Sequence, residues 1–160
     1  MADHMKDLHS ACGIAAALEV VGERWSFLIL RGAFNGLHHF EEYQSTLGIA
    51  RNILSNRLAR LVEHGILRRE PDAADRRRVA YRLTEKGREL LPVLVALRQW
   101  GERWVSGVPG NPVLVERATG RPIAPVTVRS ADGRPLKQGD LEWLDRGEID
   151  FAEVPAENAA

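Results

Sequence analysis

The chain has 160 residues, 44% of them hydrophobic, which suits one folded domain with an appendage better than two full domains. Its single cysteine, Cys12, excludes an internal disulfide framework and a cysteine-rich zinc site. No apolar run approaches the roughly 18 residues of a membrane span, and the polar start MADHMKDLHS is unlike a signal peptide. We therefore expect a cytoplasmic protein with no membrane partner, no metal and no other cofactor.

The formal net charge of zero hides an uneven distribution of charge along the chain. Residues 51–104 hold 13 lysines and arginines against 7 acidic residues, whereas residues 1–50 hold 3 against 6 and residues 105–160 hold 6 against 9. Positive charge concentrated in one segment is expected where one surface meets phosphates. A solvated basic face without a partner is the alternative interpretation.

Two helices are expected before residue 37. The first is predicted to start at Ser10, a suitable N-cap, and to end at Gly22. Its apolar residues recur at helical spacing and are Ile14, Leu18 and Val21. The second helix ends in the turn dipeptide Asn35-Gly36.

Residues 48–65 predict a turn followed by a helix with one apolar and one polar side. Gly48 separates this helix from a short one at 40–47, so the order is helix, turn, helix. The apolar stripe contains Leu54, Leu58 and Leu61, and the opposite side contains Asn52, Ser55, Asn56, Ala59 and Glu63. Ala50 occupies the expected N-cap, where alanine forgoes about 1 kcal/mol, and Asn52 is the alternative cap.

A β-hairpin is predicted after this helix, with strands at 66–70 and 79–83 and a polar turn region at 71–77. An arginine run flanks the turn: Arg76, Arg77 and Arg78. A hairpin beside such a helix has the place of the wing in winged helix-turn-helix proteins.

The helix predicted after the N-cap Thr84 has a broad apolar face, and Pro92 should bend it or mark a second start. Such a face usually requires a partner surface, so we expect it to form a homodimer interface together with the first helix. The candidate interface residues are Ile14, Leu18, Leu94, Leu97, Trp100 and Trp104. The alternative is that Trp100 and Trp104 pack onto their own chain.

Beyond residue 106 the pattern changes to short β segments and turns. Segments 113–115 and 126–128 are predicted to be extended, and the turns at 119–123 and 132–136 repeat one pattern. The tail from Gly139 is acidic and predicted to be flexible. We therefore divide the chain into a domain at 10–106 and a small β-rich extension at 107–160.

The residues described so far resemble the HxlR-type bacterial transcriptional regulators, which are relatives of the MarR-type winged helix proteins. The matching pieces are Cys12, Gly22-Glu23-Arg24-Trp25, Leu28-Ile29-Leu30-Arg31, Gly48-Ile49, Leu54-Ser55, Arg57-Leu58, Gly65 and Tyr81-x-Leu83-Thr84-x-x-Gly87. Each piece is weak alone, but the ordered set is specific and covers residues 12–104. Where this sequence has Ala50, the family pattern has serine.

The resemblance implies an α+β fold: a winged helix-turn-helix domain with flanking dimerisation helices, here followed by a small C-terminal β-hairpin region. It implies a homodimer that binds a palindromic site in double-stranded DNA, with the helix at 51–64 in the major groove and the wing over the adjacent minor groove or backbone. The family often uses its early cysteine for redox or electrophile sensing, which makes Cys12 a candidate sensor. Some relatives end in a small zinc-ribbon-like hairpin, and the two repeated turns resemble that shape without its cysteines.

Candidate roles follow from residue chemistry. Asn52, Ser55 and Asn56 are expected to read base edges, because asparagine can pair bidentately with adenine. Arg51, Arg60, Arg76, Arg77 and Arg78 are expected to contact phosphates or the minor groove. Arg57 leans toward the packed side and is expected to bridge to the preceding helix.

Two further features have competing interpretations. The pair His38-His39 suggests a metal site, but adjacent side chains point apart and no other ligand completes a tetrahedral set, so a surface or cap role is favoured. Cys12 lies near a helix N-terminus, which favours a thiolate, but a small core residue is the simpler interpretation.

The sequence thus predicts a sequence-specific DNA-binding transcriptional regulator, a repressor modulated by a small-molecule effector or by thiol oxidation. The rival is a protein-interaction module, a winged helix whose helix at 51–64 docks a protein partner. The C-terminal hairpins favour this alternative, because they offer a surface for β-augmentation. An enzyme is not expected, because no glycine-rich phosphate loop, nucleophile-base pair or metal set is present in the sequence.

Overall fold

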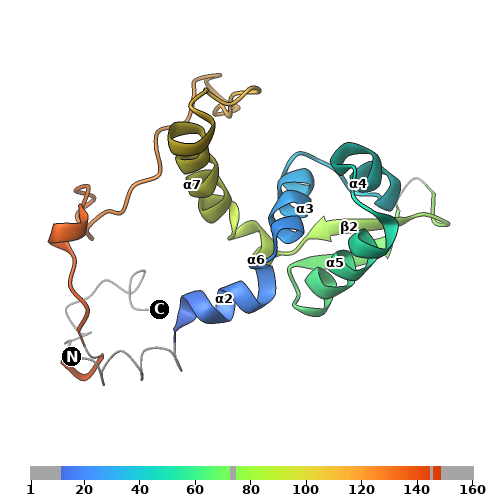
Figure 1. Cartoon of the computed structure of the whole chain (residues 1–160), viewed down its shortest axis with the longest axis horizontal. Helices are drawn as coiled ribbons and strands as arrows, with labels where there is room; N and C mark the ends of the chain where they lie inside the picture. The colour runs from blue at the N-terminus through green and yellow to red at the C-terminus, as the bar shows by residue number, and fades with distance from the viewer. Residues whose placement is uncertain (1–11, 73–74, 145, 149–160) are drawn as a thin grey trace. The chain divides into compact units, whose positions relative to one another are not determined.

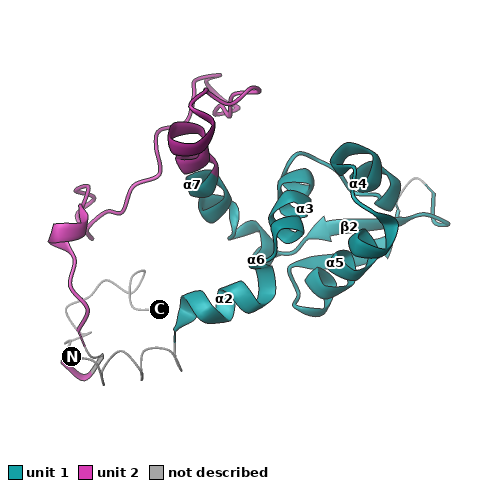
Figure 2. Cartoon of the chain, viewed as in Figure 1, with its two compact units in different colours: residues 1–97 teal, residues 98–160 magenta. Residues whose placement is uncertain are grey.

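The structure is a computed structural model that describes residues 12–72, 75–144 and 146–148. The chain divides into two compact units, residues 1–97 and 98–160, which Figure 2 shows in different colours. The predicted N-cap Ser10 and the end of the acidic tail lie outside the described residues.

Unit 1 contains most of the regular structure, as Figure 1 shows. Its elements in chain order are α2 (Gly13–Val21), α3 (Arg24–Phe34), α4 (Phe40–Leu47), α5 (Arg51–Glu63), β1 (Leu67–Pro71), β2 (Val79–Leu83) and α6 (Glu85–Arg88). Helix α2 begins at Gly13, with Cys12 as its N-cap in an extended conformation.

The core of unit 1 forms between α3, α4 and α5. Ile29, Leu54, Leu58 and Leu61 are completely buried, and so is Tyr43 on α4. The Tyr43 hydroxyl donates a hydrogen bond of 2.7 Å to the carbonyl of Leu37, and burial raises the pKa of that hydroxyl. The predicted apolar stripe of α5 is therefore its packed side.

Strands β1 and β2 form the predicted hairpin as a two-stranded antiparallel sheet, in which Leu67 pairs with Leu83 and Pro71 with Val79. Immediately after it, the side chain of Thr84 accepts a hydrogen bond from the Gly87 amide, so the predicted N-cap is confirmed. Gly87 packs so tightly that a Cβ there would lie 2.2 Å from the carbonyl oxygen of Ile66. Only glycine permits this contact between α6 and the start of the hairpin.

The long helix predicted after Thr84 is interrupted. It consists of α6, then α7 (Leu91–Gly101), then a π-helical turn at Glu102–Ser106. Pro92 lies in the first turn of α7, where a missing N–H costs little, so it marks a second start. Helix α7 spans the boundary between the two units.

Unit 2 contains two tight turns rather than extended strands within its described residues. Val115 bridges to Pro122 and Arg129 to Pro135, and no longer ladder forms among the described residues. The hydrogen bond from the Gly120 amide to Glu116 closes the first turn, and that from the Gly133 amide to Ser130 closes the second. The repeated sequence pattern thus corresponds to a repeated turn, followed by a 3₁₀ turn at Gln138–Asp140 and another at Arg146–Glu148.

His39 connects α4 to the hairpin. Its Nδ1 lies 2.9 Å from Glu42 Oε1, and its Nε2 lies 2.9 Å from Asp72 Oδ2, just beyond the end of β1. His39 is the N-cap of α4 and forms a capping box with Glu42, which confirms the cap interpretation of this histidine. The backbone adds to the connection, because the amide of Tyr81 on β2 donates to the carbonyl of His38 at 2.7 Å.

The charges in this cluster favour a protonated ring. The Glu42 carboxylate, followed by Asp72, raises the pKa of His39 against the opposing effect of burial. Backbone N–H groups, that of His38 first, and the His39 side chain lower the pKa of Glu42 to about 2. An imidazolium can donate to both carboxylates at once, whereas a neutral ring has only one N–H.

We expect the stabilisation from His39 to decrease with rising pH. Because the folded state raises the pKa of this histidine, its contribution is fully present below the unfolded value of about 6.5 and is lost as pH rises through the folded value. Urea unfolding of the native protein and of His39→Asn, measured between pH 5.5 and 8.5, should show a difference in stability that shrinks with rising pH. A difference independent of pH would contradict the protonated bridge. Glu42 does not disturb the comparison, because it titrates far below this range.

Candidate nucleic-acid interface

The polar side of α5 is open to solvent. Asn52, Ser55 and Asn56 are all exposed, whereas Leu54 and Leu58 on the opposite side of the helix are fully buried. The three polar residues lie on the first two turns of the helix and offer amide and hydroxyl groups. This arrangement brings together the three residues that the sequence predicted for base readout.

The N-terminus of α5 has no side-chain cap. Ala50 is the N-cap, as the sequence predicted, and the first turn contains no acidic residue. Free N–H groups and the positive end of the helix dipole therefore face outward at this point, an arrangement that favours anions. Arg51 adds a positive charge there, with its guanidinium 4.9 Å from the ring centre of Phe40.

Two other arginines of α5 are directed at protein groups. Arg57 forms an ion pair with Glu23, the N-cap of α3, and its side chain is only 18% exposed. The sequence had placed its partner on the preceding helix, α4, so the partner element was wrong. Arg60 donates a hydrogen bond of 2.6 Å to the carbonyl of Glu19 in the last turn of α2, which leaves its other N–H groups for further contacts.

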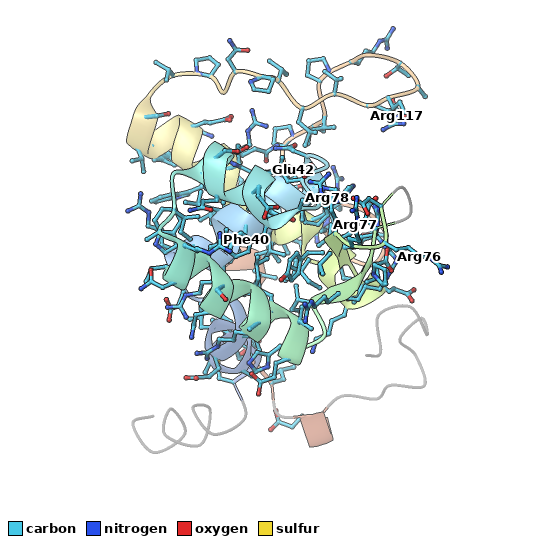
Figure 3. The ribbon with its side chains drawn as sticks, turned by 90° about the vertical axis from the view of Figure 1, so that its right-hand side faces the viewer. Phe40, Glu42, Arg76, Arg77, Arg78 and Arg117 are labelled. Carbon is cyan, nitrogen blue, oxygen red and sulfur yellow. The ribbon has the colours of Figure 1, made fainter. Side chains whose placement is uncertain are left out.

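The arginine run lies at the far end of the hairpin. Arg76, Arg77 and Arg78 are exposed, and Figure 3 shows them grouped beside the turn. The Arg77 side chain is 91% exposed and pairs with Asp75 at 3.2 Å, and this contact lowers the pKa of the Asp75 carboxyl. The run thus presents three guanidinium groups to solvent at one edge of unit 1.

The arginines on the strands themselves are engaged differently. Glu70 accepts from Arg68 at 2.8 Å and lies 2.7 Å from Arg82, and the Arg68 contact followed by the nearby charges lowers its pKa. The Arg82–Glu70 pair joins β2 to β1, whereas the Arg68–Glu70 pair lies within β1. The arginines of the turn are therefore exposed to solvent, whereas Arg68 and Arg82 on the strands pair with Glu70.

The candidate dimer residues are mostly exposed. On α2, Ile14 is 69% and Leu18 54% exposed, and only Val21 of that helix is buried. Leu97, Trp100 and Trp104 are also exposed, whereas Leu94 is partly buried. Cys12 is partly buried at the N-cap of α2.

Sequence reasoning missed three contacts near this surface: His39 with Asp72, Glu23 with Arg57, and Arg51 with Phe40. The first two join residues more than 30 positions apart, and composition and periodicity contain no signal for such pairs. The contact between Arg51 and Phe40 had a weak signal in the sequence, because Phe40 is an aromatic residue at the start of the short helix that ends at Gly48.

Comparison with known proteins agrees with this geometry. The HxlR-like helix-turn-helix family model matches residues 20–108. An uncharacterised HTH-type transcriptional regulator of Mycobacterium tuberculosis is 45% identical over 106 residues, which cover 66% of this chain and 67% of the relative.

Two solved structures extend the comparison. PA1607, described as a candidate transcription factor, has a TM-score of 0.79 and 44% identity, and the match covers 88% of this chain and 99% of PA1607. The redox regulator HypR in its reduced form has a TM-score of 0.51 and 28% identity, covering 59% of this chain and 96% of HypR.

No helix in the described residues is long and apolar enough to cross a membrane. The relatives are transcriptional regulators with a helix-turn-helix DNA-binding domain, a class that is in general not enzymatic. Sequence motifs, fold and relatives agree: the chain belongs to the HxlR-like helix-turn-helix family of transcriptional regulators.

Proposed function

We propose that the protein is a cytoplasmic repressor that binds a palindromic operator as a homodimer. The observation that carries the proposal is the exposed amide and hydroxyl side of α5, which lies in the same unit as an exposed arginine run at the hairpin turn. Residues 10–106 would form the DNA-binding and dimerisation domain, and residues 107–160 an accessory extension.

In this proposal each group on the surface has a distinct role. Asn52, Ser55 and Asn56 hydrogen-bond base edges in the major groove, where the four base pairs present distinct patterns of donors and acceptors. Five arginines contact phosphates or the minor groove and set affinity more than sequence preference: Arg51, Arg60, Arg76, Arg77 and Arg78. The uncapped N-terminus of α5 would bind a phosphate in place of the missing serine hydroxyl.

The alternative function is a protein-interaction module. In that alternative α5 docks a protein partner, and the C-terminal hairpins offer a surface for β-augmentation. The described residues of those hairpins form only isolated bridges, which weakens the second part. Failure to bind promoter DNA at any salt concentration would still favour this rival.

Asn56→Ala and Arg77→Ala should change different properties of DNA binding. Loss of the Asn56 amide should reduce discrimination between bases at one position by roughly 1–3 kcal/mol. Loss of Arg77 should weaken binding to all sequences and lower the slope of log affinity against log salt by about 1. Both quantities are measured by fluorescence anisotropy on an operator selected from random DNA by the native protein and on its single-base variants.

The exposed arginine Arg117 of unit 2 provides the matched control, and Arg117→Ala should leave both quantities unchanged. If Asn56→Ala keeps full base discrimination and Arg77→Ala keeps the salt slope, the assignments on α5 and at the hairpin are wrong.

The homodimer proposal is based on the exposed apolar residues of α2 and α7. Monomeric proteins rarely leave contiguous apolar patches in water, and burying them gains about 25 cal/mol per Å². Leu18→Asp should therefore shift the protein from dimer to monomer in light scattering after size exclusion. Val128→Asp, which alters a similarly exposed residue of unit 2, should remain dimeric. A Leu18→Asp variant that stays dimeric would remove α2 from the interface.

Thiol modulation is proposed for Cys12 because of its place at the N-cap of a candidate dimer helix and the likeness to the redox regulator HypR. Oxidation there would place a larger polar group at the entry to α2. Selection of bound sequences from random DNA should return a palindrome, and an oxidant should abolish binding in the native protein but not in Cys12→Ala. Equal loss of binding in both proteins would exclude Cys12 as the sensor and leave a small-molecule effector as the remaining form of control.

A further inference from the structure

Arg57 and Arg60 lie one turn apart on α5 and both reach the corner between α2 and α3. Arg60 donates to the carbonyl of Glu19, which belongs to the last turn of α2. Arg57 pairs with the carboxylate of Glu23, which precedes the first turn of α3. One side of α5 therefore contacts both the end of α2 and the beginning of α3.

Each contact matches the electrostatics of its helix end. The last carbonyls of a helix lack intrahelical partners and form the negative end of its dipole, so a guanidinium is favourable beside Glu19. The carboxylate of Glu23 lies at the positive end of α3, but its side chain does not cap that helix and instead pairs with Arg57. The pairing of Glu23 is thus directed toward α5.

Arg57 is held firmly in this position. Its side chain is largely buried, and its Nε atom has no hydrogen-bond partner among the described residues. Leaving a buried donor unpaired is unfavourable, so the surrounding packing and the ion pair must hold the side chain in place. An arginine serving only to contact DNA would not need this burial.

The corner itself allows little adjustment. At Gly22 a Cβ would lie 2.4 Å from the carbonyl oxygen of Leu18, so α2 closes tightly onto its own last turn before α3 begins. Two arginines of α5 thus contact this short corner, one at the end of α2 and one at the start of α3. Helix α2 presents Ile14 and Leu18 to a partner copy in the proposed dimer, and α5 presents the base-reading side chains.

We propose that Arg57, paired with Glu23 and assisted by Arg60, is a positioning residue that sets the angle between α2 and α5 and thereby the spacing of the two half-sites that the dimer accepts. In a two-fold dimer the distance between the two groove-reading helices determines the spacing between half-sites. This inference rests on the proposed function, because spacing has meaning only for a dimer on a palindrome.

The test compares Glu23→Gln, Arg57→Gln and the charge-swapped double variant Glu23→Arg with Arg57→Glu. Binding is measured on operators whose half-sites are moved apart or together by one and two base pairs. The native protein should prefer one spacing by about tenfold or more, each single variant should reduce that preference to within about threefold, and the swapped pair should restore it.

A second readout does not need DNA. Spin labels at Ala16→Cys on α2 and Ala59→Cys on α5, both exposed positions, report the distance between the two helices in a Cys12→Ala background. Labelled protein is diluted with unlabelled protein so that distances within one chain are observed. The distance distribution should broaden in Glu23→Gln and narrow again in the swapped pair.

Glu70→Gln is the matched control. It removes another carboxylate of unit 1 that pairs with two arginines, and it should change neither spacing preference nor label distances. If Glu23→Gln fails to fold, the swapped pair alone decides: native spacing preference supports the proposal, and a changed preference in a folded protein overturns it.

DNA binding tests the proposed function, and the label distances test the positioning role of Arg57. If the native protein binds no DNA, the proposed function fails, and the label distances still decide whether the Arg57–Glu23 pair sets the angle between α2 and α5. Unchanged label distances in Glu23→Gln and Arg57→Gln overturn the proposal, even if both variants bind DNA more weakly at every spacing.

Discussion

The packing of three leucines on one side of α5 is the constraint on which the rest of the structure depends. Leu54, Leu58 and Leu61 are completely buried against the core that α3 and α4 provide. Each such burial is worth about 1.5–3 kcal/mol relative to exposure, which is enough to hold a helix whose own capping is poor. Because the packing requires only one side of the helix, the other side is free to carry asparagine and serine.

The hairpin depends on this core less directly. A two-stranded sheet is marginal in isolation, so it needs contacts outside itself. Ala80 is buried, the Tyr81 amide donates to the carbonyl of His38, and the His39 side chain contacts both Asp72 and Glu42. These contacts hold the hairpin near its turn and leave the arginines of the turn exposed. Stable anchoring and accessible charge are thus combined in one short segment.

The arginines of residues 51–104 differ in their burial and in their contacts. At the hairpin turn they are exposed, on the strands they brace Glu70, and on the side of α5 they reach the α2–α3 corner. A count of positive charges in residues 51–104 treats all of these as equivalent. The three-dimensional contacts show that only part of that charge is available to a ligand.

The sequence by itself determined the elements and the two sides of α5, because hydrophobic periodicity, turn glycines and the Thr84 cap are local properties of the chain. It placed the helix-turn-helix, the hairpin strands and the uncapped start at Ala50 correctly, and its motifs identified the family.

The tertiary structure alone decided which arginines are engaged, since Arg57 meets Glu23 and Arg60 meets the Glu19 carbonyl across more than 30 intervening residues. It also decided that His39 bridges to Asp72 and that the C-terminal segments form turns rather than strands. Contacts of this kind depend on how helices pack, and packing is a property of side-chain shape in three dimensions that no local pattern encodes.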